Sequence, residues 1–398
     1  TMSTTTPTAA DFIKTGLGTA EFFGFSSLDT LGAEPDCQQC RAKLNLATSA
    51  TERRKDNLHG LLTSGLSAYC DTRLNARNEP ALFYTVERVP RSNEVALTFN
   101  IIGVEKSIAE AILIQAMRSF LTELGYENYL VRVNSLGDQD SITRYIRELT
   151  NYLRKRIDHL PAAARELMKD HALTALMHLI ETEHELGFRS PSPLEYLSDN
   201  SRRHFREIIE YLDMSETPYE IDAKLMGHHH CYSDALFSID VVDDLTDVGP
   251  TSPIIARGGR YSEYAQRASK SNLPAVGGVV VLRERKAPAR PPRAPRGDEP
   301  SVYVIQLGFG PKIRSLMLVE ELRRHGIKVH QNLTCDSLST QLRDAEARGV
   351  AHTVIIGQKE YMEGTVILRD MAARNQESIP QQQLSNYLKR VAKQTASV

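Results

Sequence analysis

Histidines 228 to 230 and the adjacent Cys231 form the densest group of potential metal ligands in the sequence. On a β-strand, successive side chains point to opposite faces, so at most two neighbours of this group converge on one ion. Cys37 and Cys40 form a Cys-x-x-Cys pair, but no second pair follows at zinc-finger spacing. A structural zinc site needs four ligands, and the sequence supplies no such set. We therefore expect no metal site.

The overall charge is nearly balanced, with 48 basic and 50 acidic residues and a net charge of −2. This balance argues against a polycation that coats nucleic acid, so any RNA contact must be a local basic surface. The five cysteines are odd in number and show no framework spacing, which is typical of a reducing compartment. Residues 1–10 are small and polar, and no apolar run approaches the roughly 18 residues of a membrane span. We expect a cytoplasmic protein.

The length of 398 residues exceeds what one hydrophobic core usually serves, so we expect at least two domains. The clearest boundary is RERKAPARPPRAPRG at 283–297, where four prolines and six basic residues exclude a helix or a central strand. We assign 283–299 as a linker between a first domain, 1–282, and a second domain, 300–398. Two interpretations of the linker stay open: a solvated tether, or a basic strap across an RNA backbone.

Strands and helices alternate regularly after the linker. The predicted strands are Val302–Gln306, Ile327–His330, Thr353–Ile356 and Thr365–Leu368. The predicted helices are Lys312–His325, a helix capped by Ser337 and ended by Gly349, and a last helix from about Pro380 to Ala392. The segment GQKEYMEG (357–364) is expected to form turns. This alternation predicts an α/β domain with helices packed on a mostly parallel sheet.

The first domain has a different pattern. The predicted strands are Ala81–Glu87, Glu94–Val104, Tyr129–Asn134, Ala235–Val242 and Val276–Leu282. Residues Ser107–Leu124 form an amphipathic helix with a single apolar stripe, and about 139–215 is a mostly helical insertion. These patterns predict an α+β domain built on an antiparallel sheet that the helical insertion interrupts.

Several segments resemble histidyl-tRNA synthetases, which are class II aminoacyl-tRNA synthetases. The C-terminal segments resemble the anticodon-binding domain shared by the His, Gly, Thr and Pro enzymes: VYVIQLG (302–308), EELRRHGIKV (320–329), DSLSTQLRDAEARGV (336–350) and IIGQKEYMEGTVILRD (355–370). In the first domain, four segments resemble motifs of the family and follow one another in the family's order: GFSSLDT (24–30), FNIIGVE (99–105), VNSLGD (133–138) and GGRY (258–261). The resemblance extends in this order over roughly three quarters of the chain, more than chance similarity to one motif would give.

This resemblance implies a class II synthetase-like domain followed by an anticodon-binding-type domain. It also implies a homodimer, because GFSSLDT resembles the family's dimer-forming first motif. Synthetases of this family join the carboxylate of histidine to the α-phosphate of ATP. Arginines and magnesium offset the charge that develops on phosphorus, so cations at those positions are indispensable.

Most of the arginines that the family uses for this reaction have no clear counterpart in the sequence. In place of the second motif's Arg-x-Glu, residues 84–99 contain only Arg88 and Arg91 nearby. Gly227 stands where the family's histidine motif has an arginine. The closing Gly-x-Glu-Arg, which clamps ATP, aligns with VLRER, where Arg283 or Arg285 is the counterpart. Losing one such arginine costs ~10²–10³ in rate, so losing two should leave little adenylation.

Other pocket residues survive. The resemblance puts Glu105 where the family holds the substrate's α-amino group, and it implies that Gly258, Gly259, Arg260 and Tyr261 form a turn that lines the amino-acid pocket. An alternative is that these four residues remain for folding. The candidate remnants of an amino-acid and ATP pocket are thus Glu105, Arg88, Gly258, Gly259, Arg260, Tyr261 and Arg285.

The leading hypothesis is a histidyl-tRNA synthetase paralogue, inactive or weak in histidine adenylation, that binds tRNA or another RNA. The alternatives are a divergent but active histidine–tRNA ligase, in which Arg88, Arg257 or Arg260 takes over, and a regulatory or accessory subunit with a synthetase-like fold. ATP and Mg²⁺ are expected only if the synthetase activity survives. The candidate RNA contacts, each of which could equally be a solvated charge, are Arg323, Arg324, Lys328, Lys359, Arg369 and Arg374.

Overall fold

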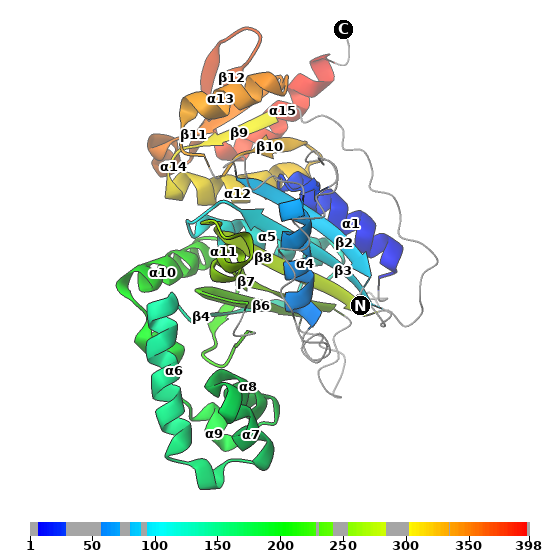
Figure 1. The fold of residues 1–398 in the computed structure, drawn as a ribbon. Coiled ribbons are helices and arrows are strands. Elements are labelled where there is room, and N and C mark those ends of the chain that lie inside the picture. Colours follow the sequence, from blue (N-terminus) through cyan, green and yellow to red (C-terminus); the bar gives the residue numbers. More distant parts are fainter. Residues whose placement is uncertain are drawn as a thin grey trace.

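A computed structural model describes residues 7–28, 57–71, 80–88, 94–227, 231–241, 254–283, 302–333 and 335–395. Figure 1 shows two sheets stacked along one direction, with a helical extension at the far end of the larger sheet. Several predictions of the sequence lie outside the described residues: Cys37, Cys40, Arg91, His228–His230, Arg285 and the linker after Arg283. Among the described helices, none is long and apolar enough to cross a membrane.

The larger sheet has eight strands in the order β1-β2-β3-β8-β7-β6-β4-β5. Their bounds are β1 (Ser26–Ser27), β2 (Ala81–Arg88), β3 (Glu94–Ile102), β4 (Tyr129–Ser135), β5 (Tyr219–Ile221), β6 (Ala235–Val241), β7 (Ile254–Arg260) and β8 (Ala275–Arg283). The central strands pair antiparallel, and only the short edge strands β1 and β5 pair parallel. The predicted antiparallel sheet is confirmed, and β1, β5 and β7 add to it.

One face of this sheet carries α1 (Ala9–Phe22) and α5 (Ile108–Glu123). The expectation of a single apolar stripe on α5 is wrong, because most of its residues are buried. The helix lies between β8, α1, α10 (Asp199–Met214) and α12 (Phe309–Arg324), so every side of it meets protein. Even Glu110 and Gln115 on this helix are almost completely buried.

The opposite face of the sheet is covered by α4 (Asn57–Asp71) and α11 (Ser262–Ser269). Leu62 and Leu66 of α4 share an apolar cluster with Val279 of β8 and with the aromatic ring of Tyr261. Burying these side chains stabilises the helix on the sheet by roughly 1.5–3 kcal/mol for each large apolar residue.

The predicted helical insertion is confirmed as an extension with its own core. It comprises α6 (Gln139–Arg154), α7 (Ala162–Asp170), α8 (Ala172–Glu181) and α9 (Glu185–Phe188), and the chain returns through α10. Asp138 caps α6 and Ser198 caps α10. The Ser198 hydroxyl donates to the Asp138 carboxylate at 2.6 Å, and the Asp138 N–H donates to Ser201 Oγ at 3.0 Å. The outgoing and returning helices are therefore tied together at the base of the insertion.

The second sheet has the order β10-β9-β11-β12-β13. Its strands are β9 (Val302–Gln306), β10 (Val329–Gln331), β11 (His352–Ile356), β12 (Thr365–Asp370) and β13 (Gln376–Pro380). Its further helices are α13 (Leu338–Ala347), α14 (Gln358–Glu363) and α15 (Gln381–Thr395). The predicted cap is confirmed, since Ser337 Oγ accepts from the Thr340 N–H at 3.3 Å.

Two expectations for this second sheet are wrong. The strands β9, β10 and β11 are parallel, but β12 and β13 run antiparallel because a tight turn joins them. In that turn the Asp370 carboxylate accepts from the N–H groups of Ala372 and Ala373, both at 2.8 Å. The segment expected to form turns contains α14, because Glu360 caps the Gly357 N–H at 3.0 Å and Gly364 ends the helix with φ 68°.

Candidate functional site

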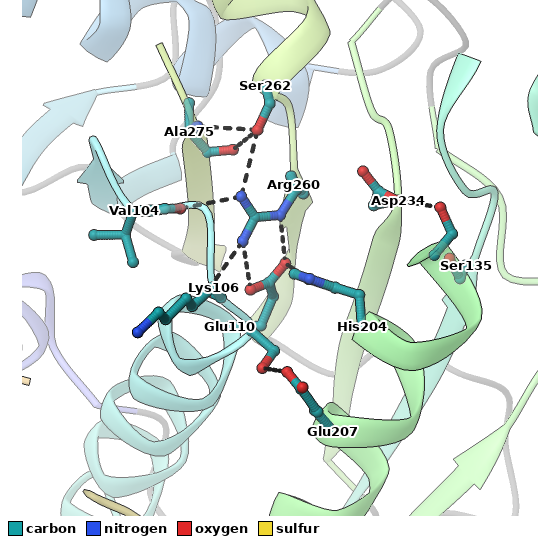
Figure 2. A network of polar contacts seen from close by, with 12 residues as sticks. Val104, Lys106, Glu110, Ser135, His204, Glu207, Asp234, Arg260, Ser262 and Ala275 are labelled. Atoms are coloured by element: carbon teal, nitrogen blue, oxygen red, sulfur yellow. Dashed lines mark hydrogen bonds and ion pairs between the residues drawn. The ribbon is translucent and has the colours of Figure 1, made fainter. Parts of the chain in front are cut away.

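Arg260 and Glu110 form a buried ion pair between the end of β7 and the start of α5. Arg260 Nε and Nη2 each donate to a different oxygen of Glu110, both at 2.8 Å. The same guanidinium donates to the carbonyls of Val104 at 3.1 Å and of Lys106 at 3.4 Å (Figure 2). Its donors are therefore committed to the protein, because Arg260 is only 3% exposed. This arrangement holds the turn between β3 and α5 in place.

His204 of α10 completes this network from the insertion side. Its Nε2 lies 2.9 Å from Glu110 Oε1, and the imidazole is largely buried (Figure 2). Burial alone would raise the pKa of Glu110, but the charges of Arg260 and His204 and their hydrogen bonds lower it to about 2. Burial would lower the pKa of His204, but the Glu110 carboxylate raises it above its ordinary value. The group thus holds a carboxylate ionised inside the protein.

Asp234 lies on the other side of His204. Its carboxylate accepts from the Ser201 hydroxyl at 2.9 Å, at the start of α10. Burial raises the pKa of Asp234, and the nearby His204 charge and the Ser201 hydrogen bond oppose that rise. The buried charges therefore connect the base of the insertion with the sheet.

Glu105 lies in the turn that Arg260 supports. Its side chain is exposed, and Oε1 accepts from Asn272 Nδ2 at 3.3 Å. The neighbouring Lys106 donates to the Asp336 carboxylate of the second domain at 2.6 Å. Glu105 is thus an available carboxylate at the edge of the first sheet, close in sequence to a contact with the second domain.

Gly258 and Gly259 are part of β7, so the expectation that they form a turn is wrong. A Cβ on Gly258 would lie 2.4 Å from Phe237 Cζ, and one on Gly259 would lie 2.6 Å from the Ala235 carbonyl oxygen. Both positions need glycine because β6 and the aromatic ring approach too closely for a side chain. Tyr261 is fully buried and its hydroxyl donates to Asn100 Oδ1 at 2.8 Å. Burial raises its pKa well above the ordinary value.

Gly227 borders Tyr232, which follows the histidine cluster. A Cβ at position 227 would lie 2.4 Å from Tyr232 Cδ2 and 3.0 Å from its Cγ. Tyr232 is buried in the apolar cluster beneath α4. An aromatic ring therefore occupies the space next to Gly227, the position that the sequence resemblance aligned with an arginine.

The remaining predicted pocket cations lie on three different strands of the first sheet. Arg88 ends β2 opposite Val95 of β3. Arg283 ends β8, is exposed, and donates to Glu94 at 3.0 Å. Arg257 is exposed on β7. Arg260, in contrast to the exposed Arg257 and Arg283, is fully enclosed and faces Glu110.

The predicted RNA contacts lie on several parts of the second domain. Arg323 and Arg324 lie on α12, and Arg324 donates to Glu320 at 2.7 Å. Lys328 precedes β10, and Lys359 lies on α14; both are exposed. Arg369 on β12 is half-buried, whereas Arg374 is exposed in the turn before β13 with φ 58°.

Sequence reasoning missed Glu110 and His204, which carry the buried network. Glu110 lies within the apolar run IAEAILIQ, and a carboxylate in a buried helix indicates a buried partner. His204 gave no comparable pattern. Among the described residues, no three His, Cys, Asp or Glu side chains form a group that could hold a metal ion.

Comparisons with known proteins agree with this architecture. Residues 301–391 match the family described as anticodon binding domain. The chain is 28% identical over 267 residues to the histidine–tRNA ligase of Geobacillus thermodenitrificans, covering 67% of this chain and 62% of the relative. It is 29% identical over 298 residues to the Thermotoga maritima histidine–tRNA ligase, covering 74% of this chain and 69% of the relative.

A solved structure of histidyl-tRNA synthetase from S. aureus has a TM-score of 0.47 and 15% identity, covering 93% of this chain and 92% of that one. The match to the Geobacillus relative spans less than two thirds of that relative's length. The chain thus combines a large, mainly antiparallel sheet with a C-terminal domain that matches the anticodon-binding family. Over 67% to 74% of its length, the chain is similar to these histidine–tRNA ligases.

Proposed function

We propose that this protein binds tRNA or another structured RNA through its second domain and has lost most or all of the ability to adenylate histidine. The anticodon-binding match over residues 301–391 supports the RNA-binding part. The state of the arginines in the first domain supports the loss of adenylation. The two parts are separate claims, and each has its own test.

The observation that carries the second part is the pairing of Arg260 with Glu110. A guanidinium that stabilises a developing negative charge must present free N–H groups to the substrate phosphate. Arg260 directs two N–H groups at Glu110 and others at the carbonyls of Val104 and Lys106. Releasing it would leave the buried Glu110 carboxylate with His204 alone, and breaking a buried ion pair costs about 3–5 kcal/mol. Arg260 is therefore a poor replacement for a lost phosphate ligand.

Position 227 supports the same proposal. Glycine has no side chain to offer a phosphate, and Tyr232 fills the adjoining space. Of the described cations, Arg257 and Arg283 are exposed at the sheet, and Arg283 is paired with Glu94. The described residues thus do not fit an ATP–Mg²⁺ complex in the way that the family's chemistry requires, and no step of that chemistry is assigned to them.

Histidine-dependent ATP–pyrophosphate exchange tests the loss of adenylation directly. We expect a rate at least ~10²–10³ below that of an active histidine–tRNA ligase assayed in parallel, since one lost arginine alone has that effect. Exchange at the rate of the active enzyme would instead establish the alternative, a divergent but working ligase with Arg257 or another cation in place of the lost arginine.

Equilibrium binding to tRNA and to primer-template DNA of equal charge tests the RNA-binding part. We expect tRNA to bind more tightly at about 150 mM salt, because phosphate contacts alone would not separate the two nucleic acids. Equal affinity for both would contradict recognition of RNA and would favour an accessory role on DNA.

Glu105 favours a second candidate, a regulatory protein that senses an amino compound without activating it. The carboxylate is exposed and hydrogen-bonded to Asn272, so it is available to an ammonium group. Calorimetry with histidine should show binding that Glu105→Gln abolishes and the exposed control Glu127→Gln preserves. Heat changes absent from all three proteins would remove this candidate while leaving RNA binding untouched.

We also propose a homodimer, on the resemblance of residues 24–30 to the family's first motif. Sedimentation equilibrium at micromolar protein concentration tests this, and a mass of one chain at all concentrations would contradict it.

A further inference from the structure

Gln115 lies at a point where three parts of the molecule meet. It belongs to α5 in the middle of the first domain and is only 2% exposed. Its Oε1 accepts from the hydroxyl of Tyr211 on α10 at 2.6 Å, and from Arg118 Nη1 at 3.0 Å. Its Nε2 donates to the carboxylate of Glu320 on α12. One carboxamide thus joins the returning helix of the insertion to the first helix of the second domain.

The surroundings make this contact part of a close-packed junction. Ile313 and Leu316 of α12 are fully buried and belong to the same apolar cluster as α5 and Tyr211. In Figure 1, α12 lies between the second sheet and the first domain, next to α5. Apolar contact of this kind supplies adhesion, but it fixes orientation weakly because it is non-directional. The hydrogen bonds supply the direction.

The hydrogen bonds of Gln115 have only one consistent sense. A carboxamide has an accepting oxygen at one end and a donating NH₂ at the other. The donors Tyr211 and Arg118 face the oxygen, and the acceptor Glu320 faces the NH₂ group. Reversing the carboxamide would set donor against donor on one side and acceptor against acceptor on the other. The carboxamide of Gln115 therefore satisfies all of its neighbours only if the side chain at position 320 accepts a hydrogen bond.

We propose that Gln115 is a positioning residue that locks the second domain and the insertion to the first domain as one mechanical unit. Tyr211 brings the insertion helix α10 to Gln115, and Glu320 brings α12 to the same side chain. Separating α12 from α5 breaks the chain of hydrogen bonds that also holds α10. The RNA-binding domain and the insertion then keep a fixed relative placement, whatever RNA the second domain binds.

A reciprocal pair of substitutions tests the lock. Gln115→Glu keeps an acceptor for Tyr211 and Arg118 but sets a carboxylate against Glu320. Amide hydrogen exchange in α12, residues 313–320, should then accelerate about tenfold, because like charges at this distance oppose docking. In the double variant with Glu320→Gln, the new amide at position 320 donates to the new carboxylate at position 115. The double variant should therefore return to the exchange rates of the unmodified protein. Gln266→Glu, exposed on α11, makes the same charge change away from the junction and should leave α12 unaffected.

The exchange of α10 provides the decisive second readout. If Gln115 couples the two parts, Gln115→Glu also accelerates exchange around Tyr211, and Glu320→Gln reverses that effect although position 320 lies on another helix. Acceleration in α12 without any change in α10 would overturn the coupling. Unchanged exchange in α12, or a double variant no better than the single one, would overturn the lock itself. Because no RNA, histidine or ATP enters these measurements, their failure is distinguishable from a failure of the proposed function.

Discussion

The aromatic ring of Tyr232 lies where any side chain at position 227 would have to begin, 2.4 Å from the place of its Cβ. The backbone of Gly227 and the ring belong to one packed unit, since Tyr232 is buried beneath α4. A side chain at position 227 and the ring of Tyr232 in its present place therefore exclude each other, and accommodating an arginine there requires more than one substitution.

Gly227→Arg should destabilise the protein and should not raise the rate of histidine-dependent ATP–pyrophosphate exchange. Inserting side-chain atoms into a well-packed region typically costs about 1–3 kcal/mol. Chemical denaturation should show this loss, and adding Tyr232→Ala should recover part of it by removing the clash. Equal stability of Gly227→Arg and the unmodified protein would contradict this prediction, because it would show that the ring of Tyr232 can move aside without destabilising the protein.

Removing one partner of the Arg260–Glu110 pair should be severely destabilising. Glu110→Leu leaves the guanidinium of Arg260 buried without its counter-charge, which costs about 3–5 kcal/mol. Adding Arg260→Met should recover part of the loss in urea denaturation, because the double variant buries no unpaired charge. An additive double variant would show that the two residues act independently.

Stability should depend on pH through Glu110 and His204 with opposite signs. The pKa of Glu110 is about 2, below its ordinary value near 4.3, so its contribution is complete above about 4.3 and is lost as the pH falls toward 2. The pKa of His204 is raised, so its contribution is complete below about 6.5 and is lost as the pH rises through the raised value. These two groups alone thus favour the window between about pH 4.5 and 6.5.

His204→Gln should abolish the loss of stability that His204 causes as the pH rises above about 6.5. The difference in unfolding free energy between pH 6 and pH 9 should shrink in this variant relative to the unmodified protein. His159→Gln, exposed in the insertion, provides the matched control and should keep the full difference. An unchanged pH profile in His204→Gln would assign the dependence to other groups.

Lys359 and Arg374 are exposed in the second domain, and each should contribute to RNA affinity if it contacts a phosphate. Replacing either with alanine should weaken tRNA binding several-fold and reduce the slope of log K against log salt by about 1. Lys14→Ala on α1 removes the same charge from the first domain and should leave the slope unchanged. Substitutions that lower affinity without changing the slope would indicate an indirect effect on folding.

Local chemistry made much of the fold predictable. Ser337 caps α13 as expected, and the apolar run Val302–Gln306 forms β9 with the predicted bounds. The strand β7 was not apparent, because Gly258 and Gly259 lower strand propensity and are explained only by the approach of Phe237 and Ala235 from β6. A short capped helix such as α14 was likewise hidden by glycines at both of its ends.

The site was harder to predict than the fold, because its central contacts join distant segments. Arg260 was identified from its resemblance to a family motif, but its partner Glu110 lies 150 positions away in the chain. His204 belongs to a different helix again, on the far side of the insertion. Local periodicity does not predict contacts between such distant residues. The sequence therefore predicted that Arg260 lines a ligand pocket, whereas its side chain is enclosed by protein.

The joined base of the insertion has a consequence for how the molecule can be dissected. The chain departs after Asp138 and returns at Ser198, and these two side chains are within 2.6 Å of each other. The helices between them have a separate apolar interior around Tyr145, Leu149 and Leu176. A short glycine-containing linker from residue 138 to residue 198 could therefore replace the helices α6 to α9. The remaining protein would retain every strand of both sheets.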